Sequence, residues 1–148
     1  MVQSIIRNQL DVQNSNDVIK ELGGIFLESD LVKETYINAV LEREQTMPTG
    51  LNTGTINVAI PHTDSEHVNE SALALATLKK PVKFRLMDDP TKEVDVEIVF
   101  LLAVKDPMEQ LGLLRKLMSI FQDDKLIYKM KNAQDDHSLN EILNSVLA

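Results

Sequence analysis

The sequence predicts a layered α/β domain in which helices cover a central β-sheet. Apolar residues recur at helical spacing in both halves of the chain, and short β-compatible runs lie between them. The run Glu97–Val104 (EIVFLLAV) is apolar almost throughout. Strands of this composition are usually covered on both faces, which favours a layered domain over a sheet open to water. Since 148 residues suit one domain, we expect a single domain over 1–148.

Two helices are expected before the sheet. The first spans Asn16–Ser29, although two glycines in its middle weaken the pattern. The second spans Leu31–Gln45, because Asp30 is a suitable capping residue and Pro48 punctuates the far end. Both carry apolar residues at helical spacing, which are Val18, Leu22, Ile25 and Phe26 in the first and Val32, Tyr36, Ala39 and Val40 in the second.

From Gly50 the pattern changes to β-compatible runs separated by turn-rich pieces. The runs are Ile56–Ile60, Ala72–Leu78 and Val94–Val104, and they predict the strands of the central sheet. The break Lys79–Pro81 is interpreted as a loop. The expected order is therefore two helices, three strands, and then two or three helices.

The C-terminal helices begin at recognisable caps. Asp106 is a capping residue followed by a proline at the first helical position, with Glu109 three residues after the cap. Ser138 and Glu141 have capping-box spacing and predict the start of the last helix. The helix after Asp106 is expected to turn one apolar stripe to the core, made of Leu111, Leu114, Leu117, Met118 and Phe121.

Composition excludes several classes of protein. The formal net charge of −8, from 15 basic and 23 acidic residues, argues against a nucleic-acid partner. No apolar run approaches the roughly 18 residues of a membrane span, and the first residues do not resemble a signal peptide, so a cytoplasmic chain is expected. The sequence has no cysteine, which excludes thiol nucleophiles and disulfides. Candidate chemistry therefore centres on the histidines, His62, His67 and His137.

His62 directly follows an apolar strand that Pro61 ends. In open α/β sheets the ligand crevice lies at the carboxyl ends of strands, so this imidazole is well placed for chemistry. A neutral ring nitrogen can attack phosphorus when the other nitrogen is oriented by a hydrogen bond. The alternative is an ordinary histidine after a strand, because strand-Pro-His is a short and common pattern.

The segment after His62 is rich in polar side chains. Thr63 or His67 could support a phosphoryl site by hydrogen bonding. Both histidines could instead hold a metal with Asp64 or Glu66, but their spacing is not a standard ligand spacing. The third interpretation is a polar, solvated turn.

Three residues outside this segment could complete an anion site. Arg43 lies eleven residues after Val32, about 1,100° along a helix and thus only about 20° from it, so it should face inward and could hold a phosphate. It could equally be a cation beside a helix C-terminus. Gln110, in the first turn of its helix, meets His62 if the two preceding strands are parallel neighbours, and is otherwise a solvated residue. Thr49 could line the same place or belong only to a turn.

Three segments together resemble the fructose/mannitol-type enzyme IIA of the phosphoenolpyruvate-dependent sugar phosphotransferase system. They are Glu42–Glu44 with Pro48–Leu51, Val58–His62, and Asp106–Leu111. The resemblance covers nearly the whole chain, and it is greatest to the galactitol-type proteins. Those proteins share an RE…PTG segment, a histidine matching His67, and glutamine at the position of Gln110.

The resemblance implies a mixed central sheet and a cytoplasmic phosphoryl carrier that needs no cofactor and no metal. His62 would accept a phosphoryl group from the phosphohistidine of HPr and pass it to a cysteine of a IIB component, while a IIC membrane partner transports a sugar or a galactitol-like polyol. Fructose and mannitol members have histidine at the position of Gln110, so His67 or Gln110 would take the supporting role here, with Arg43, Thr49 and Thr63 around the phosphoryl group.

Two other functions remain open from the sequence. One is a regulatory IIA-like phosphoprotein that signals the phosphorylation state of the system. The other is a small metal-dependent hydrolase, which would require bound metal in the purified protein.

Overall fold

Across residues 2–147, which the computed structural model describes, five strands form one mixed sheet. Its spatial order is β1-β4-β5-β3-β2. The pairs β1–β4 and β3–β5 are parallel, whereas β4–β5 and β2–β3 are antiparallel. The strands are β1 (Gln3–Leu10), β2 (Gly50–Leu51), β3 (Asn57–Ala59), β4 (Ala72–Arg85) and β5 (Glu93–Ala103). The expected layered α/β class and mixed sheet are confirmed.

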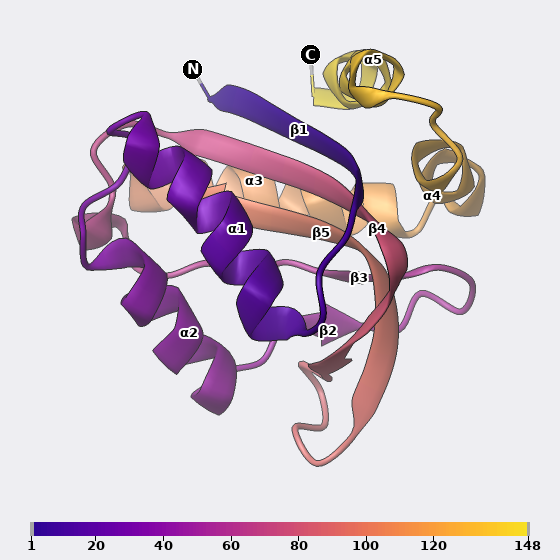
Figure 1. Cartoon of the computed structure of the whole chain (residues 1–148), viewed down its shortest axis with the longest axis horizontal. Helices are drawn as coiled ribbons and strands as arrows, with labels where there is room; N and C mark the ends of the chain where they lie inside the picture. Colours follow the sequence, from indigo (N-terminus) through magenta and orange to yellow (C-terminus); the bar gives the residue numbers. More distant parts are fainter. Residues whose placement is uncertain (1, 148) are drawn as a thin grey trace.

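Helices cover both faces of this sheet (Figure 1). One face carries α1 (Ser15–Glu28) and α2 (Tyr36–Thr46). The opposite face carries α3 (Pro107–Phe121), α4 (Asp124–Lys131) and α5 (Asp136–Leu147). Within the described chain, none of these helices is long and apolar enough to cross a membrane.

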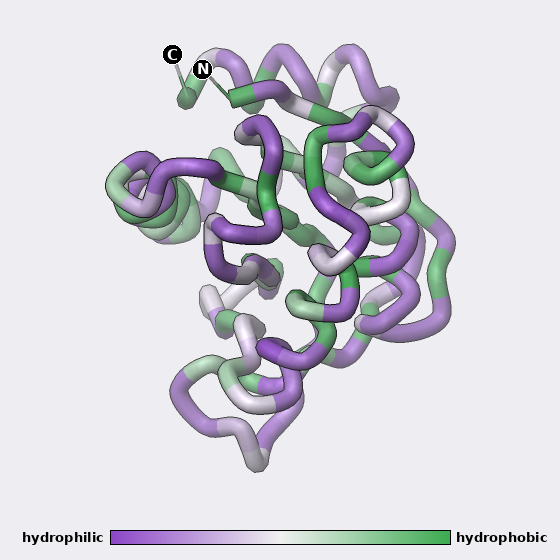
Figure 2. Tube along the Cα trace, turned by 90° about the vertical axis from the view of Figure 1, so that its left-hand side faces the viewer, coloured by the Kyte–Doolittle hydropathy of each residue, from purple (hydrophilic) through white to green (hydrophobic). Residues whose placement is uncertain are grey.

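The central strands are apolar because both of their faces are buried. Alternate residues of β4 point to opposite layers, so that Ala74 packs with α1 and α2 while Leu75 packs with α3 to α5. In β5, Leu101 and Phe100 divide in the same way. Figure 2 shows these hydrophobic strands enclosed by segments with more hydrophilic residues. The core is therefore one sheet between two apolar layers.

Two strands were absent from the expected order. β1 is an edge strand in which the polar residues Gln3, Ser4, Arg7 and Gln9 are exposed, and β2 has only two residues. The loop predicted at Lys79–Pro81 is wrong, because β4 continues through it to Arg85. The pairing with β5 shifts register between Thr77 and Val82, which leaves the two lysines and the proline exposed in a bulge.

Helix boundaries also differ at two of the expected caps. The second helix begins at Tyr36 rather than Leu31, because Asp30 takes a left-handed backbone (φ 58°) and Val32 forms an isolated bridge with Val68. In α5 the predicted cap Ser138 lies inside the helix, and its backbone N–H donates to Asp135 Oδ1 at 2.7 Å. The caps expected for these two helices were therefore wrong, whereas Asp106 caps α3 through the backbone N–H of Met108.

The buried stripe of α3 was only partly predicted. Leu117 and Phe121 are buried as expected, but Leu111 and Met118 are 41% and 39% exposed. Ile120 is buried in their place. The helix is thus rotated so that Leu111 and Met118 border the core face and remain partly in solvent.

Candidate active site

The parallel pairing of β3 and β5 determines where His62 lies. Both strands end at the same edge of the sheet, and the segment after β3 is fixed there by backbone hydrogen bonds. Leu102 N donates to Pro61 O at 3.1 Å, and Ile60 N donates to Thr49 O at 3.4 Å. Because Ile60 and Pro61 are themselves buried, the half-buried His62 projects from a rigid support.

The imidazole of His62 is held in one tautomer. Its Nδ1 lies 2.8 Å from Ile60 O, and since a carbonyl oxygen only accepts, Nδ1 must carry the proton. The lone pair is therefore on Nε2. Burial lowers the pKa of His62 below its ordinary value; the Ile60 hydrogen bond and the Asp64 carboxylate oppose this shift, and the Arg43 guanidinium adds to it. The ring is thus neutral and nucleophilic at neutral pH.

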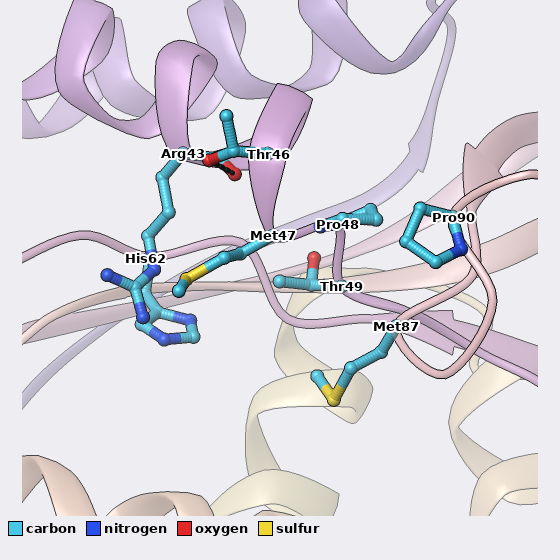
Figure 3. A pocket seen from close by; sticks show the side chains of 8 residues that line it. All are labelled: Arg43, Thr46, Met47, Pro48, Thr49, His62, Met87 and Pro90. Atoms are coloured by element: carbon cyan, nitrogen blue, oxygen red, sulfur yellow. Dashed lines mark hydrogen bonds between the residues drawn. The ribbon is translucent and has the colours of Figure 1, made fainter.

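A pocket of about 380 Å³ opens beside this ring (Figure 3). Its walls come from the last turn of α2, the segment that follows, and the connection between β4 and β5. Two apolar side chains at its rim, Met47 and Met87, are 59% and 40% exposed. The lining residues are Arg43, Thr46, Met47, Pro48, Thr49, His62, Met87 and Pro90.

Arg43 points into this pocket from the last turn of α2, and its guanidinium lies beside the His62 ring in Figure 3. The inward direction was predicted from Val32, which lies outside the helix. The correct reference is the buried Tyr36, seven residues earlier and about 20° away on the helical wheel. Arg43 Nη1 lies 3.6 Å from Asp64 Oδ1. Among the residues that the structure describes, no atom accepts a hydrogen bond from its buried Nε–H.

Thr49 forms a buried wall of the pocket, and it is held by Glu44. Its backbone N–H donates to Glu44 Oε1 at 2.8 Å, and its hydroxyl donates to Oε2 at 2.9 Å. Burial raises the pKa of Glu44, while the bonds from Thr49 and the charge of Arg85 oppose the rise. The hydroxyl proton of Thr49 is therefore directed at the Glu44 carboxylate. The sequence reasoning missed this role, although Glu44 stands beside Arg43 in the RE segment.

Close packing against the end of β4 explains why a glycine, Gly50, follows Thr49. An added Cβ would lie 2.6 Å from Arg85 O, so another residue would push β2 away from β4. Arg85 Nη2 in turn donates to the carbonyls of Glu44 and Gln45 at the end of α2. The end of α2, β2 and the outer part of β4 are thus joined around the pocket.

The other predicted residues are placed differently. Thr63 is buried directly after His62. His67 lies in a short 3-10 turn with Nδ1 2.8 Å from Thr35 Oγ1 and Nε2 3.7 Å from Glu66 Oε1, so both nitrogens face partners other than His62. Gln110 lies half-buried in the first turn of α3 and is not among the pocket residues of the described chain. The supporting roles of Thr63, His67 and Gln110 stay predictions.

The structure also bears on the metal hypothesis and on the third histidine. Within residues 2–147, no three His, Cys, Asp or Glu side chains gather in a group that could hold a metal ion. His137 is distant in sequence, on α5, where its Nε2 lies 2.8 Å from Glu141 Oε1 on the exposed surface.

A neutral histidine with one free lone pair, beside a guanidinium in an open pocket, has the chemistry that a phosphoryl carrier requires. The comparisons with known proteins agree. Residues 2–146 match the family model "Phosphoenolpyruvate-dependent sugar phosphotransferase system, EIIA 2", and the chain belongs to this family. It is therefore a phosphotransferase component of the sugar phosphotransferase system, as the resemblance implied.

Two relatives and one solved structure illustrate the similarity. The galactitol-specific EIIA component of Escherichia coli K12 is 30% identical over 127 residues, which cover 86% of this chain and 84% of that protein. The mannitol-specific IIA component of Staphylococcus aureus N315 is 29% identical over 134 residues, which cover 90% of this chain and 87% of that protein. The Escherichia coli mannitol enzyme IIA, solved in complex with phosphorylated mannitol enzyme IIB, shares the fold at 19% identity, with a TM-score of 0.78 over 95% of this chain and 94% of that one.

These relatives also bear on the regulatory alternative. The chain covers most of the length of both, and both are named as components of sugar-specific systems. The phosphoryl-carrier function is therefore favoured over a role in signalling.

Proposed function

We propose that His62 carries the phosphoryl group on Nε2, which accepts it from the phosphohistidine of HPr and passes it to a cysteine of a IIB component. The observation that carries this proposal is the 2.8 Å hydrogen bond from His62 Nδ1 to Ile60 O, because it leaves the lone pair on Nε2 alone. The His62–phosphorus bond forms as the phosphorus–nitrogen bond of HPr breaks. In the second step it breaks as a phosphorus–sulfur bond forms on IIB.

The Ile60 carbonyl contributes to both steps. Attack by Nε2 leaves positive charge on the ring, and the carbonyl that accepts from Nδ1–H stabilises that charge. In the second step the ring leaves as a neutral imidazole, which keeps the phosphoryl group transferable. Arg43 supplies positive charge and hydrogen bonds to the phosphoryl oxygens during transfer.

The pocket around His62 is open enough for two partner proteins to reach it. His62 is half-buried in a shallow pocket whose rim carries Met47 and Met87, so a donor and an acceptor can reach it in turn. The complex of a structural neighbour with phosphorylated IIB supports a IIB partner, and the galactitol and mannitol relatives support uptake of a polyol of that kind through a IIC component. Transfer from HPr to IIB would take place in the cytoplasm.

The proposal is tested by phosphorylation with phosphoenolpyruvate, enzyme I and HPr, followed by measurement of acid-labile phosphate. His62→Ala should lose the label entirely, whereas His137→Ala should label normally because His137 is exposed on α5. Undiminished labelling of His62→Ala would refute the assignment.

The supporting residues are tested by a second pair of variants. If His67 supports the phosphoryl group, His67→Ala should fold and transfer about 10²-fold more slowly, with a smaller defect for Gln110→Ala. The reverse ranking would assign the support to Gln110. Rates near wild type in both half-reactions would exclude His67.

A further inference from the structure

Asp64 is the residue whose carboxylate forms an ion pair with Arg43. It follows the buried Thr63, and its backbone is fixed because His67 N donates to Asp64 O at 3.3 Å. The carboxylate itself is 72% exposed, with Oδ1 3.6 Å from Arg43 Nη1. Glu66, two residues later and 75% exposed, lies near His67 Nε2 instead. The two acidic residues of this loop therefore have different neighbours, and only the first contacts the guanidinium of the pocket.

Arg43 has more donors than this contact uses. A guanidinium presents five N–H groups, and in the described chain the buried Nε–H has no acceptor. A phosphoryl group on His62 would bring up to two negative charges and three acceptor oxygens beside the same side chain. Asp64 and the phosphoryl group would then attract one guanidinium while repelling each other.

Resting on the proposed function, we propose that Asp64 is the counter-ion that Arg43 exchanges for the phosphoryl group, so that Asp64 weakens the hold of the pocket on a phosphoryl dianion and favours its onward transfer. A carrier between two proteins must not bind the group too tightly, because each gain in affinity slows release to the acceptor. Asp64 is a positioning residue in this scheme, since it acts through Arg43.

The test measures binding of inorganic phosphate to the whole protein by NMR, following the His62 ring and the Arg43 Nε–H signal. Asp64→Asn should bind phosphate about twofold to fivefold more tightly, which is the fold-change equivalent of an exposed ion pair. Glu66→Gln is the matched control, because it removes the same charge from the same loop without touching Arg43, and its affinity should equal that of the wild type. A role limited to folding would not tighten binding.

A double-variant cycle separates exchange of Arg43 from simple charge repulsion. In an Arg43→Gln background, Asp64→Asn should give little or no gain in phosphate affinity. A full gain in that background, an equal gain from Glu66→Gln, or unchanged or undetectable phosphate binding by Asp64→Asn would each overturn the proposal. Failure of the carrier function is distinguished separately, because it appears as absence of acid-labile label on the wild-type protein.

Discussion

The contact between Thr49 and Glu44 makes a quantitative prediction for Thr49→Val. Valine keeps the shape of threonine and the backbone N–H bond to Oε1, but it removes the hydroxyl that donates to the carboxylate. The hydroxyl lies 3.1 and 2.9 Å from the two oxygens but has one proton, so one hydrogen bond is lost. We expect destabilisation by about 1.5 kcal/mol, at the lower end for bonds to charged groups because Glu44 is only half-buried.

The loss of stability in Thr49→Val should depend on pH. Burial raises the pKa of Glu44, and both Thr49 bonds oppose that rise, so loss of the hydroxyl bond raises the pKa of Glu44 further. A carboxyl group with a raised pKa in the folded protein contributes stability that is present below its unfolded pKa and lost as pH rises through the folded one. The difference between variant and wild type should therefore be larger at pH 7 than at pH values where Glu44 is protonated.

Denaturant unfolding at several pH values measures this prediction, and the melting temperature at pH 7 should fall by about 3 to 6 °C. Thr46→Val is the matched control, since Thr46 is exposed and its hydroxyl makes only a 3.3 Å bond to Arg43 O. Equal stability of Thr49→Val and wild type at pH 7, or a loss that does not vary with pH, would refute the assigned role of Glu44.

Three further predictions concern the site and the core. The rate of His62 phosphorylation should fall as pH decreases through its lowered pKa, because the protonated ring has no lone pair; a profile centred above the ordinary histidine value would contradict this. Arg43→Lys keeps the charge but loses the planar fork, so transfer should slow while the melting temperature stays near wild type, and wild-type kinetics would remove Arg43 from the site. In α3, Leu117→Ala should destabilise the fold by about 2 to 5 kcal/mol and Leu111→Ala by less than about 1 kcal/mol, as measured by denaturant unfolding; equal losses would contradict the observed rotation of the helix.

The parts of this fold that the sequence predicted are those encoded locally. The strand through Glu97–Val104 could be recognised because burial on both faces leaves a continuous apolar run. His62 could be placed because Pro61 marks the end of its strand. β1 could not be recognised, because an edge strand with exposed polar positions has neither a clear alternation nor a continuous apolar run.

The rest of the site depends on contacts between distant segments. From the sequence, the loop after His62 could turn His67 toward or away from that ring, and in the structure His67 Nδ1 contacts Thr35, thirty-two residues earlier. Glu44 and Thr49 are close in sequence, but their bond depends on the chain reversing after α2, which Arg85 of β4 stabilises. No periodicity or spacing encodes such contacts.

The bulge of β4 has a consequence for how this pocket can change in evolution or design. Between Thr77 and Val82 the strand advances five residues (82 − 77) while β5 advances two (98 − 96), so three residues of β4 are surplus. Lys131 of α4 binds there, with Nζ 2.6 Å from Leu78 O. Beyond this bend the hairpin turns its apolar side to the α1 and α2 layer and places Met87 and Pro90 in the wall of the pocket that His62 also lines. A deletion within Lys79–Pro81 would therefore reposition one wall of the pocket and leave every residue that lines it unchanged. The width of the pocket opening that partner proteins meet can thus be changed from a remote and exposed segment.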